Sequence, residues 1–444
     1  MRVPRLLRDA GFTVLSRSAQ LGLGIAASVI LARYLGPTGK GEYALAILLP
    51  AMIVSFTNAG IGPATVFFTS RKGYARRDIL RSNTLLVIVA SLISIALAAI
   101  VLLVGRDMLF PDLPLIYLVI ALTLIPGNLL FRYLNSLLLG EQRIIAHNAL
   151  VLSRNGIFFF VIVVALAGFR FGVVAAVLSW LVADVLSGLA LVGMAKRGLS
   201  NARGKVNFEY LRSALRYGWR AHLANVFSYL YLRLDMILIG AISGSAAVGY
   251  YSVAVGVAER LWLVPSAIST TLLPRLAADK GQDGARASTP VVTRIILLVS
   301  AVVSALLAVL AKLLVGLLFS EAFLQAVRPL QILLLGVIAA SAGMLLGNDL
   351  AARGRPDLNA WINGFSCVLN LVLNLLWIPR YGIDGAAWAT SLSYVVAFLF
   401  RMAVYCRVSG NRCLDVLVPR ASDARLLWSS LRTVLQRSKR SASS

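Results

Sequence analysis

Runs of about 20 apolar residues recur along the whole chain and constrain its fold more than any other feature. A helix of that length crosses the roughly 30 Å of hydrocarbon in a bilayer. Of the 444 residues, 59% are hydrophobic and only 14% are charged. Helices are required because lipid offers no hydrogen-bond partner to backbone groups, and the short alternating pattern of a membrane barrel is missing. The chain is therefore predicted to be an all-α polytopic membrane protein.

We predict twelve membrane spans in two groups of six. The predicted domains are an N-terminal six-helix lobe over 1–195, a cytoplasmic linker over 196–216, a C-terminal six-helix lobe over 217–408 and a basic, partly amphipathic cytoplasmic tail over 409–444. The predicted spans are 12–34, 42–67, 80–104, 113–139, 145–167, 172–194, 217–239, 247–273, 291–318, 325–351, 358–378 and 384–407.

Lys and Arg residues set the predicted orientation. They gather in the loops after even-numbered spans, as in RKGYARR at 71–77 and KRGLSNARGK at 196–205, whereas the other loops carry single cations such as Lys40 and Arg170. Both termini are therefore predicted to be cytoplasmic, and the protein to lie in the cytoplasmic (inner) membrane. Because the net charge of +25 is spread over these loops as topology signals, no nucleic-acid partner is predicted.

A glycine-containing hairpin occurs at equivalent places in the two groups of spans. Gly36 and Gly41 correspond to Gly244 and Gly249, which lie 208 positions later. Glycine and proline permit a tight reversal of the chain between two spans. Since six spans is an even number, the two lobes have the same orientation, and such parallel repeats place a substrate path between them.

Ionisable side chains inside the spans are the strongest pointers to function, because each costs about 2.5–3.5 kcal/mol or more at the centre of a lipid-facing helix. Helical spacing places His222 and Arg233 on one line, with Asn225 about 60° away. Arg17 of the first span corresponds to Asn225, so the first helix of each lobe is predicted to turn a polar face toward an interior cavity. The candidates for substrate binding are Arg17, Arg154, Arg233, Arg260, His222 and Asn225, and the candidates for ion coupling are Asp184, Asp235, Glu259 and Asp349.

Several embedded arginines indicate water or an anionic ligand inside the bundle. Arginine suits phosphate because its planar fork donates two parallel hydrogen bonds. Arg132 is a further embedded cation, whereas Arg220, Arg294 and Arg401 lie near enough to the cytoplasmic face to snorkel. A structural ion pair is the alternative for any one of the embedded charges.

No enzyme signature competes with a transport function. His147 and His222 are the only histidines and have no carboxylate at metal or triad spacing, and the nucleotide-binding P-loop pattern is missing. Cys367, Cys406 and Cys413 have neither metal-ligand spacing nor a compartment that favours disulfides. The chain is therefore predicted to be no enzyme and to need neither metal nor cofactor.

Three segments resemble the polysaccharide-export branch of the MOP flippase superfamily, which contains the Wzx-like O-antigen flippases and related lipid-linked oligosaccharide flippases. They are LARYLGPTGKGEYALA at 31–46, RYGWRAHLANVFSYLYLRLDMILIG at 216–240 and VGYYSVAVGVAERLWLVPSAISTTLLPRLA at 248–277. The resemblance covers nearly all of 5–410. It implies a MATE-like fold, with two six-helix lobes around a central cavity that alternates between inward-open and outward-open states.

The resemblance also implies a function. The expected cargo is a polyprenyl-pyrophosphate-linked oligosaccharide, the repeat unit of a lipopolysaccharide O-antigen, an exopolysaccharide or a similar polysaccharide, with its pyrophosphate held in a cationic cavity. The expected partners are this cargo, membrane lipids, and polymerase and glycosyltransferase machinery. By position, Arg233 and Asp235 match the family's RLD run, and Glu259 matches its AE pair before a Trp and a Pro.

Two alternatives to the flippase remain. One is a cation-coupled multidrug antiporter of the MATE type, whose cationic drugs favour a cavity dominated by acids; here the arginines outnumber the embedded acids. The other is a membrane scaffold of polysaccharide synthesis that transports nothing. Accumulation of lipid-linked glycan on deletion favours the flippase, and drug resistance on overexpression favours the antiporter.

The tail is predicted to be dispensable. Its segment ARLLWSSLRTVLQRSKR at 424–440 has one apolar and one basic helical face, which suits a helix lying on an anionic leaflet; a disordered basic tail is the alternative. Because both lobes are complete before it, deletion of 421–444 is expected to leave folding and transport largely intact.

Overall fold

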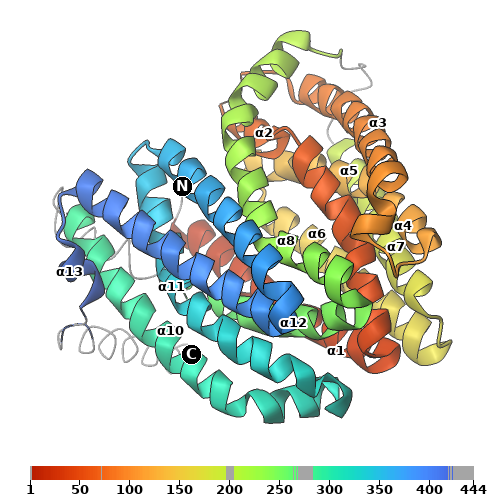
Figure 1. The fold of residues 1–444 in the computed structure, drawn as a ribbon. Coiled ribbons are helices and arrows are strands. Elements are labelled where there is room, and N and C mark those ends of the chain that lie inside the picture. Colours follow the sequence, from red (N-terminus) through yellow and green to blue (C-terminus); the bar gives the residue numbers. More distant parts are fainter. Residues whose placement is uncertain are drawn as a thin grey trace, which may run out of the picture. The chain divides into compact units, whose positions relative to one another are not determined.

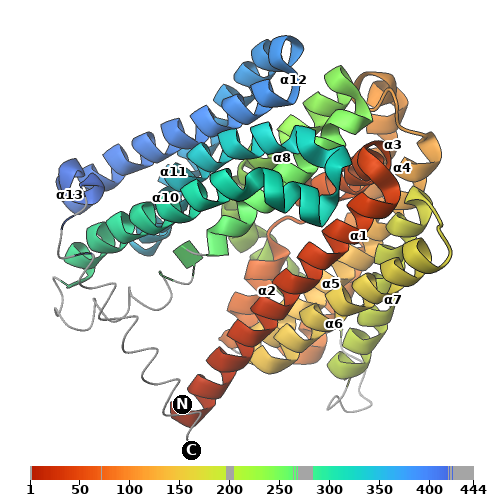
Figure 2. The ribbon, with the colours of Figure 1, turned by 90° about the horizontal axis from the view of Figure 1, so that it is seen from below.

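The computed structural model describes residues 3–71, 73–196, 205–263 and 284–418, together with the single positions 265, 266, 268, 420 and 423. Every secondary-structure element within these residues is a helix, which confirms the predicted all-α class (Figures 1 and 2). The predicted amphipathic segment 424–440 lies outside the described residues.

The chain divides into two compact units. Unit 1 comprises the described residues up to Val253 together with Val315–Leu324. Unit 2 comprises the described residues within Ala254–Leu314 and those from Gln325 onward. The helices of unit 1 are α1 (Val3–Thr57), α2 (Ile61–Ser70), α3 (Arg76–Leu109), α4 (Leu115–Leu122), α5 (Leu124–Gly140), α6 (Ile144–Val163), the short η1 (Val164–Gly168), α7 (Val173–Lys196) and most of α8 (Phe208–Glu259). The remaining helices are η2 (Arg260–Trp262), α10 (Gly284–Phe319), η4 (Glu321–Ala326), α11 (Val327–Ala352), α12 (Pro356–Ser409) and α13 (Cys413–Leu417).

Three long helices fold back on themselves at a glycine. Gly36 in α1, Gly244 in α8 and Gly382 in α12 have φ angles of 65°, 83° and 57°, in the left-handed region that glycine adopts at little cost. A straight helix would separate residues 28 and 40 by about 18 Å along its axis. Instead, the Lys40 ammonium lies 3.4 Å from the Ser28 hydroxyl. The chain therefore reverses direction at Gly36.

Contacts that a straight helix could not make also show reversals in α8 and α12. The Tyr251 hydroxyl donates a hydrogen bond to the Asp235 carboxylate at 2.7 Å, although a straight helix would hold these residues about 24 Å apart. Asn370 donates to the Thr390 hydroxyl at 3.3 Å, where a straight helix would give about 30 Å. The glycine hairpins predicted in the two halves of the chain are confirmed.

The apolar helices account for the predicted spans. Nine stretches within the described residues are long and apolar enough to cross a membrane. Three of these nine contain a glycine reversal, so they provide twelve apolar segments, in agreement with the predicted number. Side chains such as Leu103 and Val309 are 86% and 81% exposed, and so much exposed apolar surface fits lipid rather than water. The chain is a multi-pass membrane protein.

The start of α8 differs from the predicted linker 196–216. Helix α8 begins at Phe208, because the Asn207 side chain accepts a hydrogen bond from the Tyr210 backbone at 2.9 Å and so caps the helix. The Asn207 backbone in turn donates to the Ser82 hydroxyl of α3 at 3.0 Å. The last part of the predicted linker is therefore helical and docked on unit 1.

The second predicted span, 42–67, is interrupted. Ala59 and Gly60 have positive φ and separate α1 from α2. A Cβ atom on Gly60 would lie 2.3 Å from the Gly218 carbonyl oxygen, so the backbone of α8 approaches at this break. Glycine at position 60, which has no side chain, permits this close approach.

Each unit has its own apolar core. In unit 1, buried side chains of α1, α5, α6 and α7 meet around Phe158 and Ile162, and a second cluster forms around Ile125 and Tyr133. In unit 2, α11 runs along α12 (Figures 1 and 2). The predicted division into two six-helix lobes with cytoplasmic termini stays a prediction.

The hairpins of α1 and α8 contact each other through backbone atoms. A Cβ atom on Gly41 would lie 1.7 Å from the Ser245 carbonyl oxygen, and one on Gly249 would lie 2.0 Å from the Pro37 carbonyl oxygen. The same 208-residue shift relates Gly41 to Gly249 and Pro37 to Ser245. The contact is therefore reciprocal, as expected for two copies of one hairpin.

We expect Gly41→Ala to lower the free energy of unfolding by about 1–3 kcal/mol, because the added methyl group meets backbone that has no rotamer to change. Thermal unfolding of the purified protein in detergent measures the effect. Gly22→Ala is the matched control in the same helix, since a Cβ atom there meets nothing within 4 Å. Equal melting temperatures for the two variants would contradict a tight contact at Gly41.

Candidate functional site

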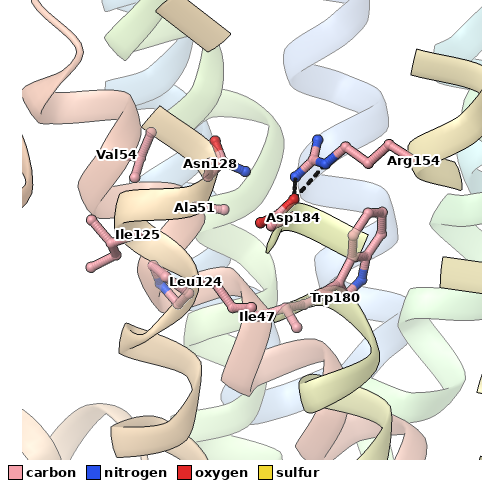
Figure 3. Close-up of a pocket in the computed structure, with 10 residues that line it drawn as sticks. Ile47, Ala51, Val54, Leu124, Ile125, Asn128, Arg154, Trp180 and Asp184 are labelled. Atoms are coloured by element: carbon pink, nitrogen blue, oxygen red, sulfur yellow. Dashed lines mark hydrogen bonds and ion pairs between the residues drawn. The ribbon is translucent and has the colours of Figure 1, made fainter. Parts of the chain in front are cut away.

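A cavity of about 190 Å³ lies inside unit 1 between α1, α5, α6 and α7 (Figure 3). Four of its lining residues carry polar groups, namely Asn128, Arg154, Trp180 and Asp184. The apolar part of the lining consists of Ile47, Pro50, Ala51, Val54, Leu124 and Ile125. A mainly apolar wall with a few convergent polar groups is the usual composition of a ligand site.

Arg154 and Asp184 form an ion pair in this cavity. The Arg154 Nε and Nη2 atoms each lie 2.5 Å from Asp184 Oδ1 (Figure 3). The Asp184 side chain is 1% exposed and that of Arg154 is 17% exposed, and pairing offsets the cost of embedding both charges. The structure thus joins a predicted substrate-binding residue to a predicted ion-coupling residue, and the pair is neutral overall.

The neighbouring helices hold the ion pair in place. A Cβ atom on Gly127 of α5 would lie 2.9 Å from Asp184 Cβ, so this glycine lets α7 come close enough to present its carboxylate. The Arg154 guanidinium lies 4.7 Å from the centre of the Phe131 ring and 5.2 Å from that of Trp180. Both distances allow attraction between the cation and the ring.

Trp180 is itself fixed by two contacts. Its indole Nε1 donates a hydrogen bond to the Tyr43 hydroxyl at 2.8 Å. Its ring stacks on Phe158, with 4.0 Å between the ring centres. The indole therefore forms a rigid wall of the cavity, linked to the hairpin of α1.

Arg132 lies one helical turn beyond Asn128 on α5, and its side chain is exposed. Arg132 Nε donates a hydrogen bond to Asn128 Oδ1 at 2.7 Å. Because a guanidinium has only donors, this bond fixes the amide orientation and leaves Asn128 Nδ2 as a donor. Within the described parts of the chain, no carboxylate forms an ion pair with Arg132.

The other predicted substrate residues of unit 1 lie outside this cavity. Arg17 and Asn225 are exposed. His222 is 5% exposed, and its Nε2 lies 2.8 Å from the Phe56 carbonyl oxygen; since a carbonyl only accepts, the imidazole is the donor. Arg233 is half-buried and donates to the Leu232 carbonyl oxygen at 3.0 Å. His222 therefore fastens α8 to the end of α1.

The other predicted charges are distributed over both units. Asp235 is buried, and its carboxylate accepts the Tyr251 hydrogen bond described above. Glu259 ends α8, and the following residue, Arg260, donates to the Gly256 carbonyl oxygen. In unit 2, Asp349 accepts a hydrogen bond from the Thr289 hydroxyl at 2.5 Å and pairs with Arg353. Their roles in substrate binding or ion coupling stay predictions.

Asn128 and Trp180 were not singled out from the sequence. A signal was present, since Asn128 precedes Arg132 by four positions and Trp180 precedes Asp184 by four, which places each pair on one helix face. A neutral amide or an indole costs less free energy in an apolar span than a charge does. Its presence there is therefore a weaker indication of function. Only the packing of four helices shows that these side chains line one cavity.

Kinked spans around a polar cavity with embedded charges are typical of membrane transporters. The fold is similar to that of the lipid II flippase MurJ in its inward-closed conformation, with a TM-score of 0.72 and 14% identity over 88% of this chain and 87% of that one. The chain therefore has the helical fold of this flippase.

The family follows from the sequence comparison. Residues 6–278 match the profile of the polysaccharide biosynthesis protein family, and residues 221–376 match the MatE profile. The chain belongs to the polysaccharide biosynthesis protein family. The predicted membership in the polysaccharide-export branch of the MOP flippase superfamily is thereby confirmed.

Two curated relatives show what the chain is similar to. It is 27% identical over 222 residues to a probable low-salt glycan biosynthesis flippase, Agl15, of Haloferax volcanii, covering 49% of this chain and 47% of the relative. It is 22% identical over 192 residues to a putative O-antigen transporter of Shigella flexneri, covering 43% and 46%. The aligned part spans about half the length of these relatives.

Proposed function

We propose that this protein is a flippase that moves a polyprenyl-pyrophosphate-linked oligosaccharide across the cytoplasmic membrane by alternating access. The observation that carries the proposal is Arg132, an exposed residue beside the polar cavity of unit 1. The names of the two curated relatives, a glycan flippase and an O-antigen transporter, support a lipid-linked glycan as cargo.

The position of Arg132 favours an anionic cargo. Arg132 lies about 12 Å along the helix axis from the end of α5 at Gly140, within the depth of the hydrocarbon. An arginine facing lipid there would cost about 2.5–3.5 kcal/mol or more, so its exposed side chain faces a water-filled space. Its two Nη groups, which donate to no described residue, suit the oxygens of a pyrophosphate, to which a guanidinium binds through two parallel hydrogen bonds.

The mechanism follows from the chemistry of such a cargo. A pyrophosphate and a glycan cannot enter hydrocarbon, because their charges and hydroxyls would lose their hydration. A path that is open sideways to the bilayer lets the head group move through water while the polyprenyl tail stays in lipid. Membrane lipids and the polymerase and glycosyltransferase machinery of polysaccharide synthesis are the partners that this role implies.

We expect Arg132→Ala to reduce transport about 10- to 100-fold, because a hydrogen bond to a charged group contributes about 1.5–3 kcal/mol. Arg132→Lys should retain part of the activity, since the charge remains while the forked geometry is lost. Accumulated lipid-linked glycan and membrane abundance are measured together in cells. Arg77→Ala removes an exposed arginine outside the predicted spans and is the control. A stable and fully active Arg132→Ala protein would contradict the proposal.

The MatE match over 221–376 supports a second candidate, a cation-coupled drug antiporter. The neutral Arg154–Asp184 pair and the exposed Arg132 disfavour cationic drugs in unit 1, because no free carboxylate lines its polar cavity. Drug resistance on overexpression, without any change in lipid-linked glycan on deletion, would favour the antiporter.

A further inference from the structure

The polar cavity of unit 1 contains hydrogen-bonding atoms that no described residue uses. Arg154 contacts only one oxygen of Asp184, and no described residue donates to the other, Oδ2. Asn128 accepts from Arg132 through Oδ1, so its Nδ2 is a spare donor. Both residues line the cavity. Figure 3 shows Asn128 and Asp184 facing the same space.

This set of atoms matches a neutral ligand rather than an anion. The cavity offers an acceptor on Asp184 and a donor on Asn128, and its only ion pair is neutral. A sugar hydroxyl both donates and accepts and therefore satisfies both atoms. A fully ionised phosphate has hydrogen-bond acceptors but no donors, and its negative charge would be repelled by Asp184 Oδ2. Trp180 and the apolar wall suit the C–H faces of a pyranose ring.

Size and position restrict the ligand further. A cavity of about 190 Å³ is smaller than the roughly 300 Å³ and more of pockets for drug-sized ligands, so it accommodates one sugar residue and not an oligosaccharide. Arg132 is joined to Asn128 by a single hydrogen bond. A phosphate at Arg132 therefore places the first sugar of the glycan next to the cavity.

We infer that this cavity is a subsite for one neutral sugar residue, the one joined to the pyrophosphate of the cargo. The inference rests on the proposed flippase function, in which Arg132 holds the pyrophosphate. Asn128, Asp184 and Trp180 then determine which sugar is accepted, while Arg132 binds any polyprenyl pyrophosphate. Cargo selection is separated in this way from cargo binding.

The test measures equilibrium binding of defined lipids to the purified full-length protein. The probes are undecaprenyl pyrophosphate alone and the same lipid carrying glucose, galactose, N-acetylglucosamine, N-acetylgalactosamine or glucuronic acid. We expect at least one neutral sugar to improve affinity about tenfold over the sugar-free lipid, as one or two hydrogen bonds would. The glucuronic acid lipid should bind no better than the glucose lipid, because its carboxylate faces Asp184.

Two variants locate the sugar preference in the cavity. Ala51→Leu fills the space from α1 without removing a polar group, and Asn128→Leu removes the spare donor. Both should bring the ratio between sugar-bearing and sugar-free lipid close to one while the protein remains monodisperse. Ala99→Leu is the matched control, because Ala99 is exposed on α3 and lies outside the cavity.

The outcomes separate the subsite from the proposed function. The subsite would be overturned if Ala51→Leu left the ratio of affinities for sugar-bearing and sugar-free lipid unchanged, or if the wild type preferred no neutral sugar. Neither result would contradict the proposed flippase function. Failure of the wild type to bind the sugar-free lipid, or an unaltered affinity for that lipid in Arg132→Ala, would overturn the pyrophosphate site and with it the proposed function.

Discussion

Replacing Asp184 with alanine should lower the free energy of unfolding by about 3–5 kcal/mol, because it leaves the Arg154 guanidinium inside the bundle without its partner. Both guanidinium contacts are made to one oxygen of this carboxylate. The neighbouring Phe131 and Trp180 rings attract the cation but cannot neutralise it. Membrane abundance and thermal unfolding in detergent measure the loss.

A double variant separates stability from function at this pair. Arg154→Met with Asp184→Leu removes both charges, and such replacements of buried ion pairs are often neutral for stability or better. We therefore expect the double variant to accumulate like the wild type but to lose the sugar preference of the cavity. If Asp184→Ala alone is as stable as the wild type, the pair does not hold the helices together.

The glycine hairpins could be predicted because their cause is local. A positive φ combined with ψ near 180°, as at Gly36 and Gly244, is open to glycine almost alone, whatever packs around it, and the repeated spacing placed both in equivalent loops. The Arg154–Asp184 pair joins residues 30 positions apart on two helices. The sequence showed that each charge needed a partner but not which one, since that choice depends on the packing of α5, α6 and α7.

Long-range packing also leads us to expect a different result for deletion of the tail. Arg294 was expected to snorkel to the cytoplasmic face, and residues 421–444 were expected to be dispensable. Instead, Arg294 is 3% exposed, and its Nε and Nη2 donate to the two oxygens of Asp423 at 2.7 and 2.8 Å. Its Nη1 donates to the Asp415 carbonyl oxygen in α13. A charge in unit 2 thus depends on a residue of the tail.

The Arg294 contact also predicts a pH dependence. Its hydrogen bonds lower the pKa of Asp423 below the usual value of 3.8. A carboxyl whose pKa is lower in the folded than in the unfolded state stabilises the fold above its unfolded pKa, and this contribution is lost as the pH falls through the folded pKa. Acidification below pH 3.8 should therefore lower the melting temperature of the wild type more than that of Asp423→Asn.

A chain that ends after Arg420 should lose about 3–5 kcal/mol of stability, because Arg294 stays buried without its carboxylate. A chain that ends after Ala424 is the matched control: it lacks nearly the same residues but keeps Asp423, and we expect it to unfold like the full-length protein. Adding Arg294→Met to the shorter chain should restore its stability, since the unpaired charge is gone. Thermal unfolding and membrane abundance of the three proteins measure this. Equal stability of the two truncated chains would show that the tail carries no structural role through Asp423.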